Sequence, residues 1–146
     1  MIHKPDLFTI DELVCPDVYN HFGETAWQFF DTRLLITMDV IRQKLDKPMY
    51  INDWQVHGNF TQSGFRCLKC GIVKDAIAKD QLYCSAHMRG QAIDFHVPNM
   101  TAEEVRQWII KNATLWPYPI RLEDGVNWIH LDVVDAEKEK VYLFKP

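Results

Sequence analysis

The sequence has no excess of positive charge, no long apolar run and few cysteines. Its 16 Lys and Arg residues are outnumbered by 20 Asp and Glu residues, which gives a formal net charge of -4. Binding to nucleic acid requires a basic patch, so we expect no nucleic-acid partner. A membrane span needs about 20 apolar residues, whereas the longest candidate run, residues 34–36, ends at Thr37. We therefore expect no membrane partner either.

The start of the sequence and its cysteines indicate a reducing compartment. Residues 1–6 contain neither the apolar region nor the small-residue cleavage site of a secretory signal. Four cysteines in 146 residues do not suggest a disulfide scaffold. We therefore expect a cytoplasmic protein, which would reach a substrate outside the membrane only after something else releases it.

The length and composition favour one domain over residues 1–146. Hydrophobic residues make up 47% and charged residues 25%, which is typical of a globular protein and excludes a disordered tail, a collagen-like fibre and a coiled coil. Apolar residues every three or four positions predict a long helix over about residues 25–45. Capping boxes at residues 9–12 and 101–104 predict two more helix starts, and residues 72–79 favour another helix.

Strand signals gather in the last third of the chain. A short strand is predicted at residues 49–53, and three more at residues 120–123, 128–133 and 141–144. Turn residues at 124–127 predict a hairpin between the first two of these three. Helices first and strands late indicate an α+β fold with an antiparallel sheet.

The segment that carries most chemistry contains a histidine and an aspartate at close spacing. His87 and Asp94 lie seven positions apart in the sequence. Gly90 and Ala92 between them are small, so the backbone can turn tightly. We therefore expect the two side chains to converge.

A later predicted strand, residues 128–132, adds a second histidine. Side chains alternate along a strand, so His130 shares one face with Asp132. Together with His87 and Asp94, His130 would make a ligand set that suits Zn²⁺. Three protein ligands leave the fourth tetrahedral position to water, as in catalytic zinc sites.

Such a site has a defined chemistry. Zinc lowers the pKa of its bound water to about 7 and polarises a scissile carbonyl. A nearby carboxylate then takes the proton of the water and passes it to the leaving amine. A single histidine is more often an ordinary surface or core residue than a ligand, so the prediction rests on the joint pattern.

The pattern His-x-x-Gly-x-Ala-x-Asp, preceded by Ser85 and followed by Trp-x-His-x-Asp, resembles the family of zinc D-Ala-D-Ala carboxypeptidases and L-alanyl-D-glutamate endopeptidases, metallopeptidase family fifteen. Residues 8–15 are similar to the opening helix of its phage and bacterial members. Residues 63–66, Ser-Gly-Phe-Arg, resemble their Ser-Gly-Tyr-Arg segment. The resemblance extends from residue 8 to about residue 134. It implies a hedgehog/DD-peptidase-like fold, in which helices pack on one side of the antiparallel sheet.

The resemblance also implies residue roles. The zinc ligands would be His87, Asp94 and His130. Arg66 would polarise the scissile carbonyl or hold a substrate carboxylate, which suits its planar fork of donors, and Ser85 would donate a hydrogen bond to the substrate. The plainer alternatives are a surface ion pair for Arg66 and a turn or cap hydroxyl for Ser85.

The catalytic base is the point at which the sequence departs from some relatives. Several members carry a carboxylate three residues before the last histidine, where this chain has Asn127. Glu123 and Asp124 lie seven and six residues before His130, and we expect Glu123 to be the base, with Asp124 second. The alternative is that both are solvated charges of the hairpin.

Three further residues are weaker candidates. We expect Asp132 either to orient a ligand imidazole or to form an exposed ion pair with a lysine. His57 is a candidate for lining the substrate cleft. His96 would lie either near the ligands or at the surface.

The cysteines allow a second metal site but do not favour it. Cys67 and Cys70 form a Cys-x-x-Cys pair, and Cys15 and Cys84 would complete a Cys₄ zinc site. The spacing to Cys15 and Cys84 is irregular, and no second pair exists. No βαβ pattern frames the pair, which argues against a thioredoxin-like function. We therefore prefer reduced thiols in a loop and in the core.

The sequence thus predicts a zinc metallopeptidase that cleaves an amide bond in the peptide stem of bacterial peptidoglycan, as a D-Ala-D-Ala carboxypeptidase or an L-Ala-D-Glu endopeptidase. A phage or prophage endolysin, released to the cell wall on lysis, and a cytoplasmic dipeptidase both fit. One alternative is a hedgehog-like zinc module that binds a partner or assembles into a phage particle without catalysis. Another is a structural domain without metal.

Overall fold

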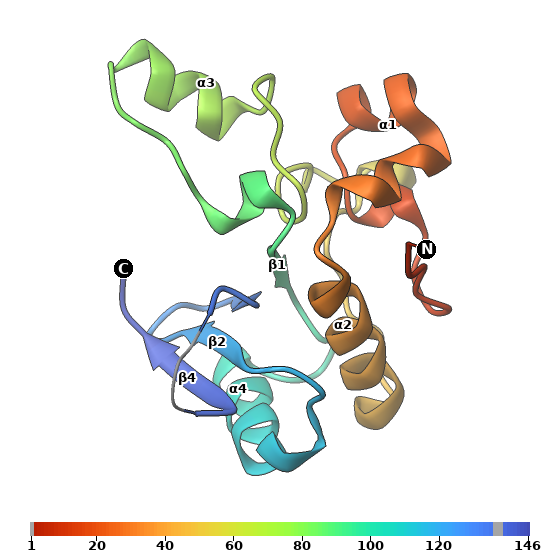
Figure 1. The fold of residues 1–146 in the computed structure, drawn as a ribbon, viewed down its shortest axis with the longest axis vertical. Helices are drawn as coiled ribbons and strands as arrows, with labels where there is room; N and C mark the ends of the chain where they lie inside the picture. The colour runs from red at the N-terminus through yellow and green to blue at the C-terminus, as the bar shows by residue number, and fades with distance from the viewer. Residues whose placement is uncertain (1, 136–138) are drawn as a thin grey trace.

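The computed structural model describes residues 2–135 and 139–146, and in these residues it shows an α+β fold (Figure 1). The α-helices are α1 (Pro16–Phe22), α2 (Thr32–Leu45), α3 (Gly71–Ala78) and α4 (Ala102–Lys111). The strands are β1 (Ala92–Phe95), β2 (Ile120–Glu123), β3 (Ile129–Asp132) and β4 (Val141–Phe144). Short 3₁₀ helices are η1 (Ile10–Glu12), η2 (Gly23–Phe29), η3 (Trp54–Val56), η4 (Ala86–Arg89) and η5 (Ala113–Leu115).

The four strands form one mixed sheet in the order β1-β3-β2-β4. β3 pairs antiparallel with β1 and β2, which confirms the predicted hairpin, but β2 and β4 are parallel. The expectation of an antiparallel sheet is therefore wrong at this edge. The hairpin brings the end of β3 back beside the start of β2, with Asp132 opposite Arg121. Because both edges of β3 are paired, β4 joins the free edge of β2 and runs in the same direction.

Alternation along the strands gives the sheet one apolar and one polar face. The apolar face carries the buried residues Ile93 and Phe95 of β1, Ile129 and Leu131 of β3, and Ile120 and Leu122 of β2. These side chains join those of α2 and α4 in one hydrophobic core. The polar face carries Asp94, His130, Asp132, Arg121 and Glu123. The fold therefore leaves this face for polar chemistry.

The predicted long helix over residues 25–45 is interrupted. The 3₁₀ helix η2 ends at Phe29, and α2 begins at Thr32, with Asp31 as its N-cap. The carboxylate of Asp31 accepts a hydrogen bond from the backbone N–H of Arg33 at 2.9 Å. An Asp side chain that caps the backbone in this way starts a new helix. The apolar spacing continues across the break because both segments pack on the core.

Several other predicted elements are confirmed. Helix α3 matches the prediction at residues 72–79, and α4 follows the capping box of Thr101 and Glu104. The strands at residues 120–123 and 141–144 match as well, and β3 is shorter by one residue at each end than predicted. The predicted strand at residues 49–53 is reduced to a single bridge between Tyr50 and His96.

Strand β1 was not predicted as a strand, because its alternation is short and contains Asp94.

No helix among the described residues is both long and apolar enough to cross a lipid bilayer.

Candidate metal centre

His87 is placed by a short helical turn that only glycine can end. Helix η4 carries His87 and ends at Gly90, whose φ is +65°. A Cβ on Gly90 would lie 1.9 Å from the carbonyl oxygen of Phe29, so no larger residue fits there. The backbone N–H of Asp31 also donates to the Gly90 carbonyl at 2.9 Å. The tight turn expected from the small residues of this segment is therefore present.

Asp94 and His130 are placed by the sheet. They lie directly opposite each other in the antiparallel pair of β1 and β3. Directly opposed residues have their Cβ atoms about 5 Å apart and on the same face. The pairing of the two strands therefore brings these side chains together, although 36 residues separate them in the chain.

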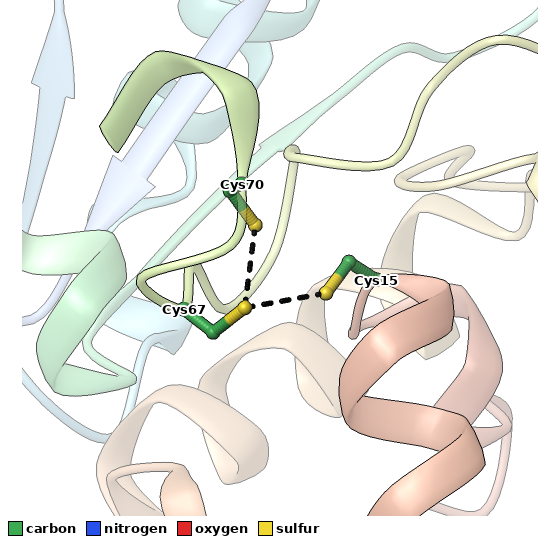
Figure 2. Close-up of side chains that lie close together, drawn as sticks. All are labelled: Cys15, Cys67 and Cys70. Atoms are coloured by element: carbon green, nitrogen blue, oxygen red, sulfur yellow. Dashed lines mark hydrogen bonds between the residues drawn. The ribbon is translucent and has the colours of Figure 1, made fainter. Parts of the chain in front are cut away.

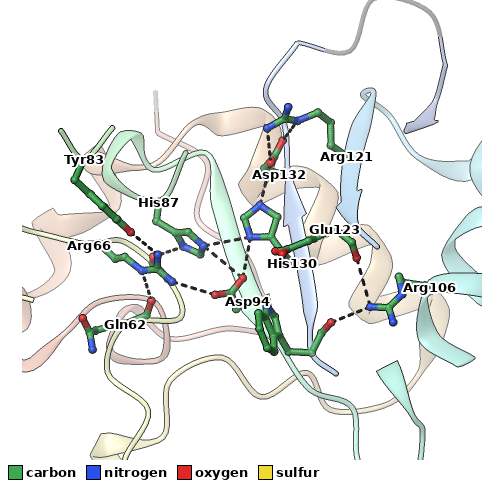
Figure 3. Close-up of polar contacts among 12 residues, drawn as sticks. Gln62, Arg66, Tyr83, His87, Asp94, Arg106, Arg121, Glu123, His130 and Asp132 are labelled. Atoms are coloured by element: carbon green, nitrogen blue, oxygen red, sulfur yellow. Dashed lines mark hydrogen bonds and ion pairs between the residues drawn. The ribbon is translucent and has the colours of Figure 1, made fainter. Parts of the chain in front are cut away.

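Three potential ligand atoms converge where η4 meets this pair (Figure 3). His87 Nε2 lies 3.3 Å from His130 Nδ1 and 3.4 Å from Asp94 Oδ1, and His130 Nδ1 lies 2.9 Å from Asp94 Oδ1. Zinc–nitrogen and zinc–oxygen bonds of about 2.1 Å would place two ligand atoms of a tetrahedron about 3.4 Å apart. The three residues can therefore hold a metal ion.

In each imidazole, the ring nitrogen that faces away from the candidate metal position donates a hydrogen bond, which fixes the orientation of the ring. His87 Nδ1 donates to the carbonyl oxygen of Gly64 at 2.9 Å, which leaves the lone pair on Nε2. His130 Nε2 donates to Asp132 Oδ2 at 2.9 Å, which directs Nδ1 toward Asp94. Partners of this kind orient the histidine ligands of metals and raise their basicity.

The pKa values of the group reflect the same contacts. Burial alone would raise the pKa of Asp94, but the hydrogen bonds from His130 and His87 outweigh it and hold that pKa well below its usual range. Burial alone would lower the pKa of His130, but the hydrogen bonds to Asp132 and Asp94 raise it to about 9. Asp94 is therefore ionised at neutral pH, and a metal would compete with a proton for His130.

Asp132 accepts a hydrogen bond from the imidazole of His130, which is the contact that the first of the two predictions for it requires. It is fully buried and accepts two hydrogen bonds from the guanidinium of Arg121, at 2.7 and 2.9 Å. Arg121 also lies 4.5 Å above the ring of Phe144. Burial opposes ionisation of Asp132, yet the hydrogen bonds from His130 and Arg121 keep its pKa lowered. The alternative of an exposed pair with a lysine is wrong.

Arg66 is not a surface ion pair but belongs to this network. Its Nη2 donates to Asp94 Oδ2 at 3.1 Å, its Nη1 to the hydroxyl of Tyr83 at 2.6 Å, and its Nε to the carbonyl of Gln62 at 2.7 Å. Only 13% of the side chain is exposed. The guanidinium therefore faces the metal-ligating group with a restricted orientation (Figure 3).

His87, Asp94 and His130 line a cavity of about 400 Å³. Besides the three candidate ligands, its lining includes Arg66, Ser85, Arg89 and Glu123. Ser85 Oγ is buried, and within residues 2–135 and 139–146 no group forms a hydrogen bond with it. Glu123 reaches the cavity from the end of β2, on the same sheet face as His130.

Three other candidates lie outside the cavity. Asp124 forms an ion pair with Lys145 at 3.7 Å and does not line the cavity, because it begins the turn after β2. His57 is exposed in a turn with φ +66° and does not line the cleft. His96 is exposed and packs against Phe60, so it lies at the surface.

Two residues of the network were not assigned a role from the sequence. Tyr83 accepts the hydrogen bond of Arg66, and no sequence signal marks it. Arg106 is buried and donates to the carbonyl oxygens of Val126, Trp128 and Glu123, at 2.8, 3.0 and 3.5 Å. It thereby holds the turn that follows Glu123. An arginine on the apolar side of an amphipathic helix is the signal that could have identified it.

The four cysteines are free thiols, which fits the preferred reading of reduced thiols in a loop and in the core, but three of them lie close together. Cys15, Cys67 and Cys70 come together as a second potential metal-ligating group. Cys84 is exposed and lines the cavity of the first group, so the Cys₄ arrangement does not form. Cys15 is affected by this proximity, because a hydrogen bond from Cys70 lowers its pKa to about 6.

In comparisons with known proteins, no family model, curated protein or solved structure matches the chain. The interpretation of the site therefore depends on its own geometry and chemistry.

Proposed function

We propose that this protein is a zinc-dependent peptidase that cleaves an amide bond in the peptide stem of bacterial peptidoglycan. The observation that carries the proposal is the triangle of His87 Nε2, Asp94 Oδ1 and His130 Nδ1 at the floor of a cavity that also contains Glu123. Three protein ligands are the number found in catalytic zinc sites, whereas structural sites have four. The resemblance of the sequence motifs to the family fifteen peptidases supports the substrate class.

His87, Asp94 and His130 would hold the zinc ion. When bound, zinc supplies a Lewis acid that polarises a carbonyl oxygen and makes water acidic near neutral pH. Glu123 would accept the proton of the attacking water and deliver it to the leaving amine. Among the described residues, no hydrogen bond or ion pair engages the Glu123 carboxylate, so it is available for this transfer.

Arg66 and Ser85 would position the substrate. The Arg66 guanidinium can bind a carbonyl or carboxylate oxygen of the substrate, and Tyr83 and Gln62 restrict its orientation. Ser85 Oγ, which forms no hydrogen bond in the part of the chain that the structure describes, would donate one to the substrate. Arg89 and Arg121 add two further cationic side chains to the lining. Peptide stems carry carboxylates, so a cavity with these arginines suits them.

The test is mass spectrometry of peptidoglycan fragments after incubation with zinc-loaded protein. We expect new amines and carboxylates at one type of stem bond. Glu123→Gln should lower the rate by about a hundredfold or more while the zinc content stays unchanged. Asp124→Asn is the matched control, because Asp124 lies outside the cavity, and it should cleave at nearly the rate of the unmodified protein.

Two outcomes would contradict the proposal. If the zinc-loaded protein leaves all fragments unchanged, the chain is not a peptidoglycan hydrolase. If Glu123→Gln cleaves as fast as the unmodified protein, the proton acceptor is another group.

The second candidate function is a zinc module that binds a partner without catalysis. One observation favours it: Asn127, which stands where several family members carry a carboxylate, is exposed and does not line the cavity. This reading predicts that the unmodified protein and Glu123→Gln bind zinc equally and are both inert.

A further inference from the structure

Three cysteine side chains meet at a point outside the cavity, and together we name them the cysteine cluster (Cys15, Cys67 and Cys70; Figure 2). Cys67 Sγ lies 3.7 Å from Cys15 Sγ and 3.9 Å from Cys70 Sγ. All three sulfur atoms lie within 4.8 Å of one another, although 52 residues separate Cys15 from Cys67.

These distances match coordination to a single metal ion. A zinc–sulfur bond of about 2.3 Å places two sulfur ligands of a tetrahedron about 3.8 Å apart. A disulfide would require about 2.05 Å between two sulfurs, so the three residues are thiols in this arrangement. The backbone N–H of Lys69 donates to Cys67 Sγ at 3.4 Å, a contact that stabilises a thiolate.

The cluster also lies where the fold needs a connection. Cys15 precedes α1, and Cys70 precedes α3. Helix α3 buries only Val73 and exposes Ile72 and Ile77, so it has little apolar contact with the core. Figure 1 shows α3 at the outer edge of the molecule. A metal bound by the cluster would fasten the start of this helix to the body.

We propose that Cys15, Cys67 and Cys70 bind a structural zinc ion as thiolates. Each thiol releases its proton to solvent on binding, and no group changes its oxidation state. Cys67 also lines a cavity of about 380 Å³ together with Asp17 and His21. A structural site has four protein ligands, and this cavity gives room for a fourth from its own lining, which includes the His21 imidazole.

The proposed ion would also support the candidate metal centre. Cys67 directly follows Arg66, the guanidinium of which donates to Asp94. Gln62 links both ends of the Cys67–Cys70 segment. Its side chain accepts a hydrogen bond from the backbone N–H of Ile72 at 2.8 Å, and its backbone carbonyl accepts one from Arg66 Nε. A metal at the cluster therefore restrains the segment that orients Arg66. The proposal does not depend on catalysis.

The first test uses the unmodified protein. Metal analysis of protein purified under reducing conditions should find two zinc ions per chain. Replacement of zinc by Co²⁺ should give the ultraviolet charge-transfer band of a cobalt–thiolate complex. One zinc ion per chain with no cobalt–thiolate band would overturn the proposal, and so would two thiols instead of four in the denatured protein, because that count indicates a disulfide.

The second test separates the two sites with variants. Cys67→Ala with Cys70→Ala should lose one zinc ion and the cobalt–thiolate band, and hydrogen exchange in α3 should be at least about tenfold faster. Cys84→Ser is the matched control, because Cys84 is exposed and outside the cluster, and it should keep both ions and the band. A band that persists in the double variant would overturn the proposal.

The same measurements distinguish failure of this proposal from failure of the proposed function. A protein with one zinc ion, a cobalt–thiolate band and no hydrolysis has the cysteine site but not the peptidase. A protein that hydrolyses peptidoglycan without the band has the peptidase but not the cysteine site.

Discussion

The two groups of side chains that could hold a metal ion differ in how the protein positions them. In the candidate metal centre, Asp94 and His130 lie on paired strands, and each imidazole has its second nitrogen in a hydrogen bond. In the cysteine cluster, the three residues lie at helix starts and in a loop, and the sulfurs contact mainly one another. The first group therefore has more hydrogen-bonding support from the protein than the second, which the proposed zinc ion would restrain.

The chemical types of the potential ligands also differ between the two groups. Two imidazoles and a carboxylate beside a cavity leave a position for a reactant, which is the arrangement of catalytic zinc. Thiolates at the junction of chain segments suit zinc that stabilises a fold. The comparison teaches that support from neighbouring polar groups marks the site at which chemistry is expected.

The largest effect is expected when one ligand of the candidate metal centre is removed. His130→Ala should lower peptidoglycan hydrolysis more than about a hundredfold, because loss of a ligand exceeds loss of a group that merely orients one. Metal analysis should show that one zinc ion is lost while the cobalt–thiolate band remains. His96→Ala is the control, because His96 is exposed and outside the cavity. Loss of the band in His130→Ala would show that the two sites are not independent.

A smaller loss is expected from the buried arginine beside Glu123. Arg106→Ala removes a buried guanidinium that donates to the carbonyl oxygens of Val126 and Trp128 in the β2–β3 turn, so the free energy of unfolding should fall by about 3 kcal/mol. Urea unfolding measures it. Arg42→Ala, which removes an exposed contact to the Lys47 carbonyl, should change stability by less than about 0.5 kcal/mol. Equal losses in the two variants would contradict the role given to Arg106.

Asp132→Asn tests whether orientation of His130 matters as much as the comparison implies. It should weaken zinc binding at this centre by about 10–100-fold, because the partner of His130 Nε2 loses its charge. Competition with a metal indicator measures the affinity. Asp135→Asn removes an exposed carboxylate of the neighbouring segment and should leave the affinity unchanged. An unchanged affinity in Asp132→Asn would mean that the hydrogen bond does not support the ligand.

The smallest effect concerns Asp31, which joins α2 to the turn between His87 and Asp94. Hydrogen bonds from Arg33 and Gln91 lower its pKa to about 2. The stability that Asp31 contributes is therefore complete above its ordinary pKa of 3.8 and is lost as the pH falls toward about 2. Asp31→Asn should cost about 1 kcal/mol at neutral pH.

The measurement is urea unfolding of both proteins in the presence of a chelator between pH 2 and pH 7. The difference between them should shrink as the pH falls. If the difference in free energy of unfolding does not depend on pH, the charge of the Asp31 carboxylate does not contribute to stability.

Much of the helical structure is evident from the sequence, because caps and apolar spacing are local signals. Helices α3 and α4 and strands β2 and β4 follow from such signals. The break before α2 and the parallel pairing of β4 do not, because they depend on where Asp31 and the end of β3 lie in three dimensions.

The candidate ligands show the same division. His87, Asp94 and His130 could be selected from their spacing, because periodicity and small residues restrict where side chains point. Glu123 was selected from the resemblance to peptidases that carry the base on the preceding strand. Whether Asp124 or His57 reaches the cavity could not be read from spacing, because turn geometry decides it.

The sequence by itself determined the donor atoms available to each candidate metal site and the helices and strands that carry most of them. Only the tertiary structure decided that three cysteines from distant segments meet while Cys84 does not, and that Arg66 and Asp132 contact the ligands. The physical reason is that local sequence sets backbone conformation, whereas contacts between distant residues follow from strand pairing and from the burial of apolar surface in a shared core.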